Sequence, residues 1–196
     1  MLDQRKSTIG VFIDLKKAFD TINHDILLKK LEFYGVRGIV NDWLYSYLNN
    51  RKQLVLLDNT KSNLLDVICG VPQGSILGPK LFILYINDIV QVSDLLKLII
   101  FADDTNAFYS GENIRNVANT VSSELNKLKI WFGVNKLSLN VSKTNYMVFT
   151  NSKIPPNIDI SIQDYIIEKV NVTKFLGVLI DEKLNWKQHI EMVKRN

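Results

Sequence analysis

Three aspartates stand where the sequence offers the clearest opportunity for chemistry. Asp14 ends an apolar run that begins at Thr8, and Asp103 and Asp104 interrupt a second apolar run. If the strands formed by the two runs pair, the three carboxylates converge. Closely spaced carboxylates repel one another unless cations neutralise them or they share protons. The pattern therefore points to a cation-binding site.

The ligand atoms indicate which cation such a site would take. Oxygen ligands favour Mg²⁺ or Mn²⁺, and no His or Cys cluster competes for a softer metal. Two such ions about 4 Å apart stabilise both the attacking and the leaving oxygen of an in-line phosphoryl transfer. An ordinary polar turn also contains paired aspartates, and Asp14 alone would suit a strand-end cap, so the acids by themselves leave both interpretations open.

The elements that must position these acids are strands interleaved with helices. STIGVFID predicts a buried strand ending at Asp14, and LLKLIIFADDTNAFYS predicts a hairpin with the two adjacent acids at its tip. Asn23 is expected to cap a helix that stops near Gly35. Further helices are expected over residues 39–50, from Pro79 and over 113–132, hairpins over 53–68 and 170–181, and a strand over 136–150.

This order of elements predicts an α+β fold. Because the strands are joined partly by hairpins, we expect an antiparallel sheet of the split βαβ, ferredoxin-like kind, packed on helices. Residues 1–150 are expected to form one domain, and residues 151–196 a linker at Pro155 and Pro156, a hairpin and a helix. The tryptophans are expected in the core and His24 at the surface or a helix cap; the tryptophans are Trp43, Trp131 and Trp186.

Composition narrows the classes of protein. The chain has 196 residues, 46% of them hydrophobic, and a formal net charge of +4, which suits a phosphate-bearing partner only weakly because the cations are dispersed. A single Cys69 makes no internal disulfide. No apolar run reaches the roughly 18 residues of a membrane span, and no signal peptide begins the chain. We therefore expect an intracellular protein without a membrane partner.

The sequence motifs around the acids are more specific to one protein family than the acids themselves. FIDLKKAFD over residues 12–20, GVPQGSILGP over 70–79 and FADD over 101–104 resemble, in this order, the palm motifs of reverse transcriptases. LSLNVSKTNYMVF around Lys143 and KFLGVLID from Lys174 look like the fourth and fifth motifs, so the resemblance covers nearly the whole chain. Three details resemble the reverse transcriptases of non-LTR retrotransposons of the LINE or jockey-like type. They are the Phe of FADD, the SILGP ending of the second motif and the segment NHDILLKKL.

This resemblance implies an RNA-directed DNA polymerase. The polymerase palm would occupy residues 1–150 with most of the fingers missing, and residues 151–196 would hold the start of a thumb. Its partners would be an RNA template, a DNA primer and deoxynucleoside triphosphates, and its cofactor two Mg²⁺ ions, with Mn²⁺ as a substitute. The nucleus and the cytoplasm are both compatible with it, since no clear targeting signal is present; the sequence does not predict an oligomeric state.

The resemblance also assigns the metal ligands. Asp14, with the backbone carbonyl of Leu15, and Asp103 would bind the two ions. Asp104 would complete the acidic cluster with a smaller direct share of the coordination. These three aspartates are thus the expected catalytic residues.

Five residues are expected at the nucleotide. Phe19 would lie under the sugar and exclude a 2′-hydroxyl, and Ala18 is small enough to admit the triphosphate. Gln73 and Gly74 would line the nucleotide and template pocket. Lys143 would protonate or stabilise the leaving pyrophosphate. Plainer alternatives remain for all of them except Ala18: Phe19 as a core residue, the glycine-rich loop as structure only, and Lys143 as a solvated lysine.

A second function from a different class also fits the sequence. A truncated or domesticated fragment would lack activity and would only bind nucleic acid or a protein partner. Such a fragment is expected to bind RNA in a salt-sensitive and metal-independent way.

Overall fold

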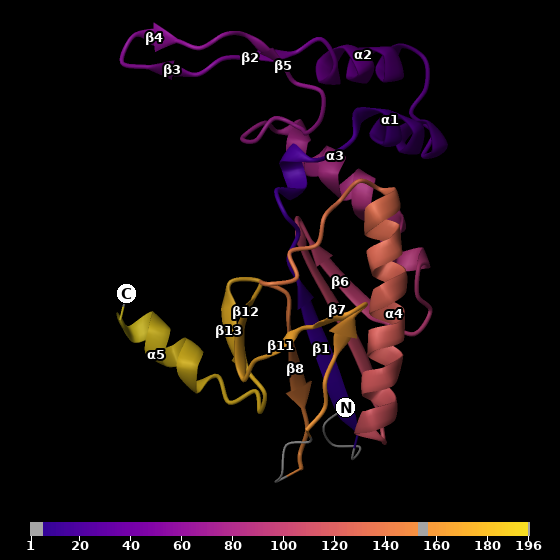
Figure 1. Cartoon of the computed structure of the whole chain (residues 1–196), viewed down its shortest axis with the longest axis vertical. Coiled ribbons are helices and arrows are strands. Elements are labelled where there is room, and N and C mark those ends of the chain that lie inside the picture. Colours follow the sequence, from indigo (N-terminus) through magenta and orange to yellow (C-terminus); the bar gives the residue numbers. More distant parts are fainter. Residues whose placement is uncertain (1–5, 153–156, 196) are drawn as a thin grey trace. The chain divides into compact units, whose positions relative to one another are not determined.

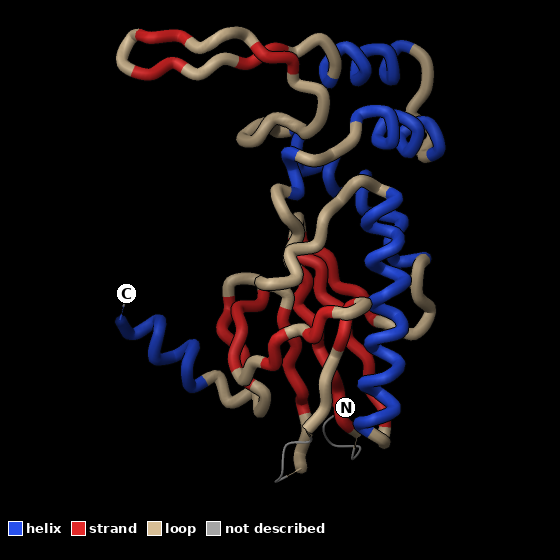
Figure 2. The backbone as a smooth tube through the Cα atoms, in the orientation of Figure 1, coloured by secondary structure: helices blue, strands red, loops and turns tan. Residues whose placement is uncertain are grey.

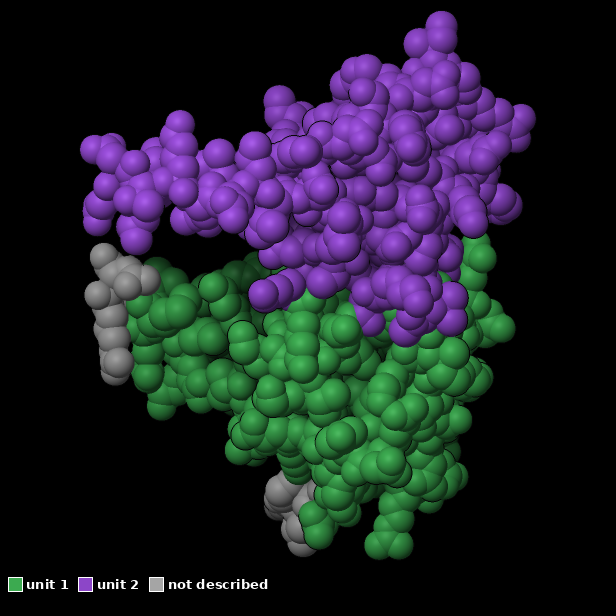
Figure 3. Space-filling view, turned by 45° about the horizontal axis from the view of Figure 1, so that its top comes forward, with its two compact units in different colours: residues 1–16, 89–132, 138–196 green, residues 17–88, 133–137 purple. Residues whose placement is uncertain are grey.

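A computed structural model of the whole chain describes residues 6–152 and 157–195. The chain divides into two compact units, coloured separately in Figure 3. The first unit comprises residues 1–16, 89–132 and 138–196, and the second comprises residues 17–88 and 133–137. This division follows packing and does not test the boundary expected after residue 150, which stays a prediction. Pro155 and Pro156, the expected linker, lie outside the described residues.

The first unit is built on a five-stranded sheet with the order β11-β8-β1-β7-β6 (Figure 1). Its strands are β1 (Ser7–Ile13), β6 (Lys97–Phe101), β7 (Asp104–Gly111), β8 (Asn145–Phe149) and β11 (Glu168–Lys169). All neighbours pair antiparallel except β11 and β8, which are parallel. Without the short β11, this order is that of a ferredoxin-like split βαβ sheet, so the predicted α+β fold is confirmed.

One face of this sheet is covered by α4 (Ile114–Val134), which runs along it in Figures 1 and 2. All residues from Ile9 to Ile13 of β1 are buried, as expected for a central strand with both faces covered. The helix contributes an apolar stripe at the predicted spacing: Val117, Val121, Leu125, Leu128 and Phe132 are all buried.

The opposite face packs against a hairpin formed by β12 (Val172–Phe175) and β13 (Val178–Asp181). Its turn, Leu176–Gly177, has positive φ at both residues, which is the geometry that two-residue hairpin loops prefer. Phe175 meets Phe12 of β1 edge to face at a ring distance of 6.2 Å. The predicted hairpin over residues 170–181 is therefore confirmed, and aromatic packing fixes it to the sheet.

Shorter elements complete the described part of the first unit. They are the strands β9 (Ser161–Ile162) and β10 (Tyr165–Ile166), the helix α5 (Lys187–Arg195), and most of the 3₁₀ helix η3 (Asn87–Gln91). The strand predicted over residues 136–150 is mostly wrong, because only Asn145–Phe149 is a strand and the residues before it form a turn.

In the second unit, the predicted cap and stop of α1 (His24–Phe33) are confirmed. The Asn23 side chain accepts the Ile26 backbone N–H at 3.0 Å. Gly35, with φ of 96°, ends the helix, and the N–H groups of Gly35 and Val36 bond back to the carbonyls of Glu32 and Leu31. This is a Schellman motif.

The second unit also contains η2 (Ala18–Asp20), α2 (Ile39–Leu48) and α3 (Leu77–Ile86). The helix expected from Pro79 thus begins two residues earlier. The predicted hairpin over residues 53–68 is present as β2 (Lys52–Gln53), β3 (Leu56–Leu57), β4 (Thr60–Lys61) and β5 (Leu65–Asp66). Asp58 and Asn59, both with positive φ, make its turn.

Two expectations about single residues were wrong. Trp43 is 54% exposed, because α2 buries Leu44 and Leu48 instead. Trp186 is 47% exposed and lies just before α5. His24 is buried rather than at the surface, and its Nε2 lies 2.8 Å from the carbonyl oxygen of Gly70. In the described residues, no helix is both long and apolar enough to cross a membrane.

Candidate active site

Strand register brings the ends of β1 and β7 side by side in the first unit. Ile13 pairs with Thr105, so the next step of the antiparallel ladder places Asp14 across from Asp104. Phe101 pairs with Asp104, which leaves Ala102 and Asp103 as the hairpin tip. The acids therefore lie where two apolar strands end, as the sequence predicts.

The backbone of this tip differs from the expected one in a detail. We expected the acids to tolerate the tight turn, but the left-handed residue is Ala102, with φ of 51°. A non-glycine residue in that conformation is strained by roughly 1 kcal/mol or more. The strain falls on the residue next to Asp103, and the two aspartates keep ordinary backbone angles.

Electrostatics shows that the three carboxylates act on one another. Asp104 is exposed as a residue, yet protein atoms partly surround its carboxyl group and raise its pKa. The negative charges of Asp103 and then Asp14 raise the pKa of Asp104 further, while Lys174 on β12 opposes them. The acids thus form one repelling cluster with a cation of the same unit nearby.

The donor atoms of this cluster suit a hard divalent cation. Asp14, Asp103 and Asp104 offer only carboxylate oxygens, and mutual repulsion gives a cation a reason to bind. Within residues 6–152 and 157–195, however, no group of three or more Asp, Glu, His or Cys side chains is placed so that it could hold a metal ion. The ligand chemistry fits the expected ions, and closure of the ligand shell would require the side chains to turn toward them.

The Leu15 carbonyl is not used in pairing with residues 138–140. The Lys16 N–H donates to the Ser138 carbonyl at 2.8 Å, and the Asn140 N–H donates to the Asp14 carbonyl at 2.8 Å. In this antiparallel pattern the amide and carbonyl of Leu15, which bridges to Leu139, point to the other side of the strand. Pairing with residues 138–140 therefore does not occupy the Leu15 carbonyl.

Asn140 is a site residue that the sequence reasoning missed. Its side-chain Nδ2 donates to Asp14 Oδ2 at 2.8 Å, and the Ser142 hydroxyl donates to its Oδ1 at 2.9 Å, which fixes the orientation of the amide. The Thr144 hydroxyl accepts the Asp14 N–H at 3.3 Å. The only sequence signal was the place of Asn140 in the motif LSLNVSKT.

Lys143 belongs to the same turn. The N–H groups of Lys143 and Thr144 both bond to the Asn140 carbonyl, at 3.0 and 2.9 Å. Because Asn140 also holds Asp14, the turn ties the backbone of Lys143 to an acid of the cluster. The Lys143 side chain is exposed, so its solvated alternative stays open.

The residues expected at the triphosphate and at the sugar, Ala18 and Phe19, lie in the second unit, on η2. Ala18 is buried, and the half-buried Phe19 ring packs on Phe82 at a ring distance of 4.8 Å. The Phe19 carbonyl accepts the Val71 N–H at 2.9 Å, which joins η2 to the glycine-rich loop. Phe19 is thus partly a packing residue and keeps part of its surface available.

Backbone contacts hold the glycine-rich loop in place. Gly70, with φ of 84°, lies so close to Asp20 that an added Cβ would come within 2.8 Å of the Asp20 carbonyl oxygen. Gly74 has φ of 80° and open space around it. Gln73 is exposed, and its Nε2 donates to Asp20 Oδ1 at 2.6 Å. Asp20 therefore orients the Gln73 amide.

The predicted site residues fall into two groups, each described within its own unit. The first unit holds the three aspartates with Leu15 and Lys143, and the second holds Ala18, Phe19, Gln73 and Gly74. Their assigned roles at metal and nucleotide stay predictions.

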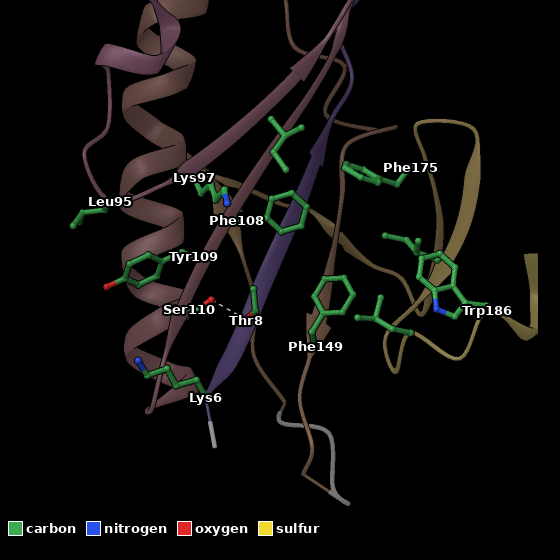
Figure 4. Close-up of a pocket in the computed structure, with 13 residues that line it drawn as sticks. Lys6, Thr8, Leu95, Lys97, Phe108, Tyr109, Ser110, Phe149, Phe175 and Trp186 are labelled. Carbon is green, nitrogen blue, oxygen red and sulfur yellow. Dashed lines mark hydrogen bonds between the residues drawn. The ribbon is translucent and has the colours of Figure 1, made fainter. Parts of the chain in front are cut away.

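A separate cavity of about 720 Å³ opens on the first unit and contains none of these residues (Figure 4). Its walls are mainly apolar, with Phe108, Phe149, Phe175 and Trp186 among them. Lys6 reaches it from the start of β1. Its lining lacks the clustered acids, so it is not the expected catalytic centre.

Comparison with known proteins identifies the family. The family described as "Reverse transcriptase (RNA-dependent DNA polymerase)" matches residues 1–180. The chain belongs to the reverse transcriptase family. Within this family, its relatives support the non-LTR, jockey-like type that the motifs predicted.

Three relatives of this reverse transcriptase domain come from Drosophila melanogaster. The probable RNA-directed DNA polymerase from transposon BS is 30% identical and matches 98% of the chain and 22% of its own length. The one from transposon X-element is 29% identical over 98% of the chain and 21% of its own length. The RNA-directed DNA polymerase from mobile element jockey is 26% identical over 99% of the chain and 22% of its own length. The chain therefore spans about a fifth of these relatives.

Solved structures support the fold of this reverse transcriptase domain. Apo telomerase from Candida tropicalis, truncated from its C-terminal domain, has a TM-score of 0.60 at 16% identity, covering 89% of this chain and 34% of that chain. Telomerase from the same species in complex with a fragment of telomeric RNA has a TM-score of 0.59 at 15% identity. This match covers 93% of this chain and 30% of that chain. At such low identity, the likeness concerns the fold alone.

Proposed function

We propose that this chain is the catalytic palm of an RNA-directed DNA polymerase that extends a DNA primer on an RNA template. The observation that carries the proposal is the convergence of Asp14, Asp103 and Asp104 at the paired ends of β1 and β7. Membership in the reverse transcriptase family supports it independently.

In this proposal, Asp14, Asp103 and the Leu15 carbonyl hold two Mg²⁺ ions, or Mn²⁺, and Asp104 adds negative charge beside them. Bound divalent ions stabilise the attacking and leaving oxygens of an in-line phosphoryl transfer. Asn140 keeps one oxygen of Asp14 hydrogen-bonded, which leaves Oδ1 to face a ligand. Lys143 supplies positive charge or a proton to the leaving pyrophosphate.

The second unit would bind the deoxynucleoside triphosphate. The Phe19 ring, braced by Phe82, excludes a ribose 2′-hydroxyl, and Ala18 leaves room for the phosphates. Gln73, oriented by Asp20, and the open backbone of Gly74 line the nucleotide and the template.

Primer extension on poly(rA)/oligo(dT) with Mg²⁺ tests this function. We expect incorporation of dTTP by the wild-type chain and a loss of at least about a hundredfold in Asp103→Asn, which keeps the shape of the side chain but removes its charge. Asp164→Asn is a matched control, because Asp164 is an exposed acid of the same unit. Absence of incorporation by the wild type contradicts autonomous activity.

A non-catalytic binding fragment is the second candidate. The observation that favours it is that, in the described residues, no group of three or more Asp, Glu, His or Cys side chains is placed so that it could hold a metal ion. This alternative predicts salt-sensitive RNA binding that neither Asp103→Asn nor removal of metal changes. RNA binding combined with no metal-dependent incorporation would select it.

A further inference from the structure

A second set of charged side chains surrounds a polar cavity of about 720 Å³ in the second unit. Three cationic residues line it, Lys17, Arg51 and Lys52, together with the carboxylates of Asp20 and Asp66. None of the three cations was singled out by the motif analysis.

Both carboxylates already have partners. Asp20 Oδ1 accepts the Gln73 amide at 2.6 Å. Asp66 lies 3.8 Å from Lys52 across the β2–β5 pair, and the two side chains are 70% and 58% exposed, so this ion pair is weak. Each acid still carries its negative charge, so the three cations exceed the two acids by one charge.

Arg51 and Lys17 form no ion pair within the part of the chain that the structure describes. Arg51 as a residue is half-buried, and its guanidinium, which has no carboxylate partner in the described residues, can take an external anion. Its planar fork matches phosphate, which it can bind through two hydrogen bonds.

The backbone holds these cations at the cavity wall. The Arg51 carbonyl accepts the Val67 N–H at 2.9 Å at the base of the hairpin. Lys17 has φ of 49°, a left-handed conformation, and its carbonyl is held by the N–H groups of Asp20 and Thr21 at 2.9 and 3.1 Å. Strain retained by surrounding bonds at a charged residue is a feature of ligand sites.

We propose that Lys17, Arg51 and Lys52 bind the backbone phosphate of a nucleic-acid strand in this cavity. Three cations against two carboxylates leave a net charge of +1, which matches a singly charged phosphodiester better than a triphosphate. Gln73 on the same wall offers hydrogen bonds to the attached sugar or base. The identity of the strand as RNA template rests on the proposed function.

Binding of a short, fluorescein-labelled single-stranded RNA, followed by anisotropy across a salt series in EDTA, tests this site. We expect Arg51→Gln to weaken binding about fivefold at low salt and to lower the slope of log K against log salt by about 0.7. Arg51→Lys is expected to keep the slope. Lys61→Gln is the matched control, because it removes one exposed charge from β4, outside the cavity.

The outcomes separate this site from polymerase activity, since no incorporation is measured. Equal salt slopes for Arg51→Gln and Lys61→Gln overturn the proposal, as does a wild type that binds no RNA. A parallel titration of the same variants with dTTP tests whether the phosphate comes from a nucleotide instead of a nucleic-acid strand. If Arg51→Gln weakens dTTP binding and leaves RNA binding unchanged, the ligand is the nucleotide and the strand assignment is wrong.

Discussion

At the scale of single residues, repulsion within the acidic cluster opposes folding at neutral pH. Burial and the charges of Asp103 and Asp14 raise the pKa of Asp104 above its unfolded value. The folded chain therefore binds this proton more tightly than the unfolded chain does. The resulting stabilisation is present at low pH and is lost as pH rises through the raised pKa.

Asp104→Asn should reveal how much the ionised Asp104 carboxylate destabilises the folded chain. In EDTA, the variant is expected to unfold at a higher temperature than the wild type near pH 7, because it removes the repulsion, and the difference should shrink toward pH 3, where Asp104 is protonated. Mg²⁺ should narrow the gap at pH 7. Thermal melts across pH measure it, with Asp164→Asn as the control; a constant gap at all pH values contradicts the electrostatic explanation.

The sequence predicted some site residues for reasons that the structure makes clear. Asp14, Asp103 and Asp104 stood out because charged residues interrupt apolar runs, a pattern visible in one dimension. Asn140 did not, since its role depends on a side-chain bond to Asp14, 126 residues earlier in the chain. The cation Lys174, which acts on Asp104 from the β12–β13 hairpin, was hidden for the same reason.

At the scale of elements, the turn from Asn140 to Thr144 supports Asp14. Asn140→Ala removes a hydrogen bond to a charged group and should lower the free energy of unfolding by about 1 to 2 kcal/mol. It should also raise the Mn²⁺ concentration needed for half-saturation about threefold, because Asp14 is freer to rotate.

Asn126→Ala provides the comparison for this turn. The Asn126 side chain accepts the Gln163 N–H at 2.7 Å in the same unit, so its loss costs stability without touching the acids. If both variants change Mn²⁺ half-saturation equally, Asn140 stabilises the fold only and does not position Asp14.

The regular elements were largely predictable, and the failures have physical causes. Helix α4 and the hairpins carried clear periodicity and turn residues, and the structure contains them. The expected strand over residues 136–150 failed because Ser142 and Thr144 bond locally and favour a turn. The apolar pattern of α2 did not show that only Leu44 and Leu48 would be covered.

At the scale of the whole molecule, one compact unit carries the three acids and Lys143, and the other carries the remaining residues proposed for the nucleotide, Ala18, Phe19, Gln73 and Gly74. The connection from β1 to β6 contains most of the second unit. Sequence order indicated that the motifs belong to one enzyme, but it held no information about this division into units.

The most direct test of the central claim is Mn²⁺ binding, measured by electron paramagnetic resonance on the wild-type chain and on Asp103→Asn. Mn²⁺ takes the place of Mg²⁺ at oxygen ligands, and the measurement needs neither template nor primer. We predict that the wild type binds Mn²⁺, that Asp103→Asn weakens binding at least about tenfold, and that Asp164→Asn leaves it unchanged. Equal Mn²⁺ binding by all three proteins would contradict a metal site at Asp14, Asp103 and Asp104.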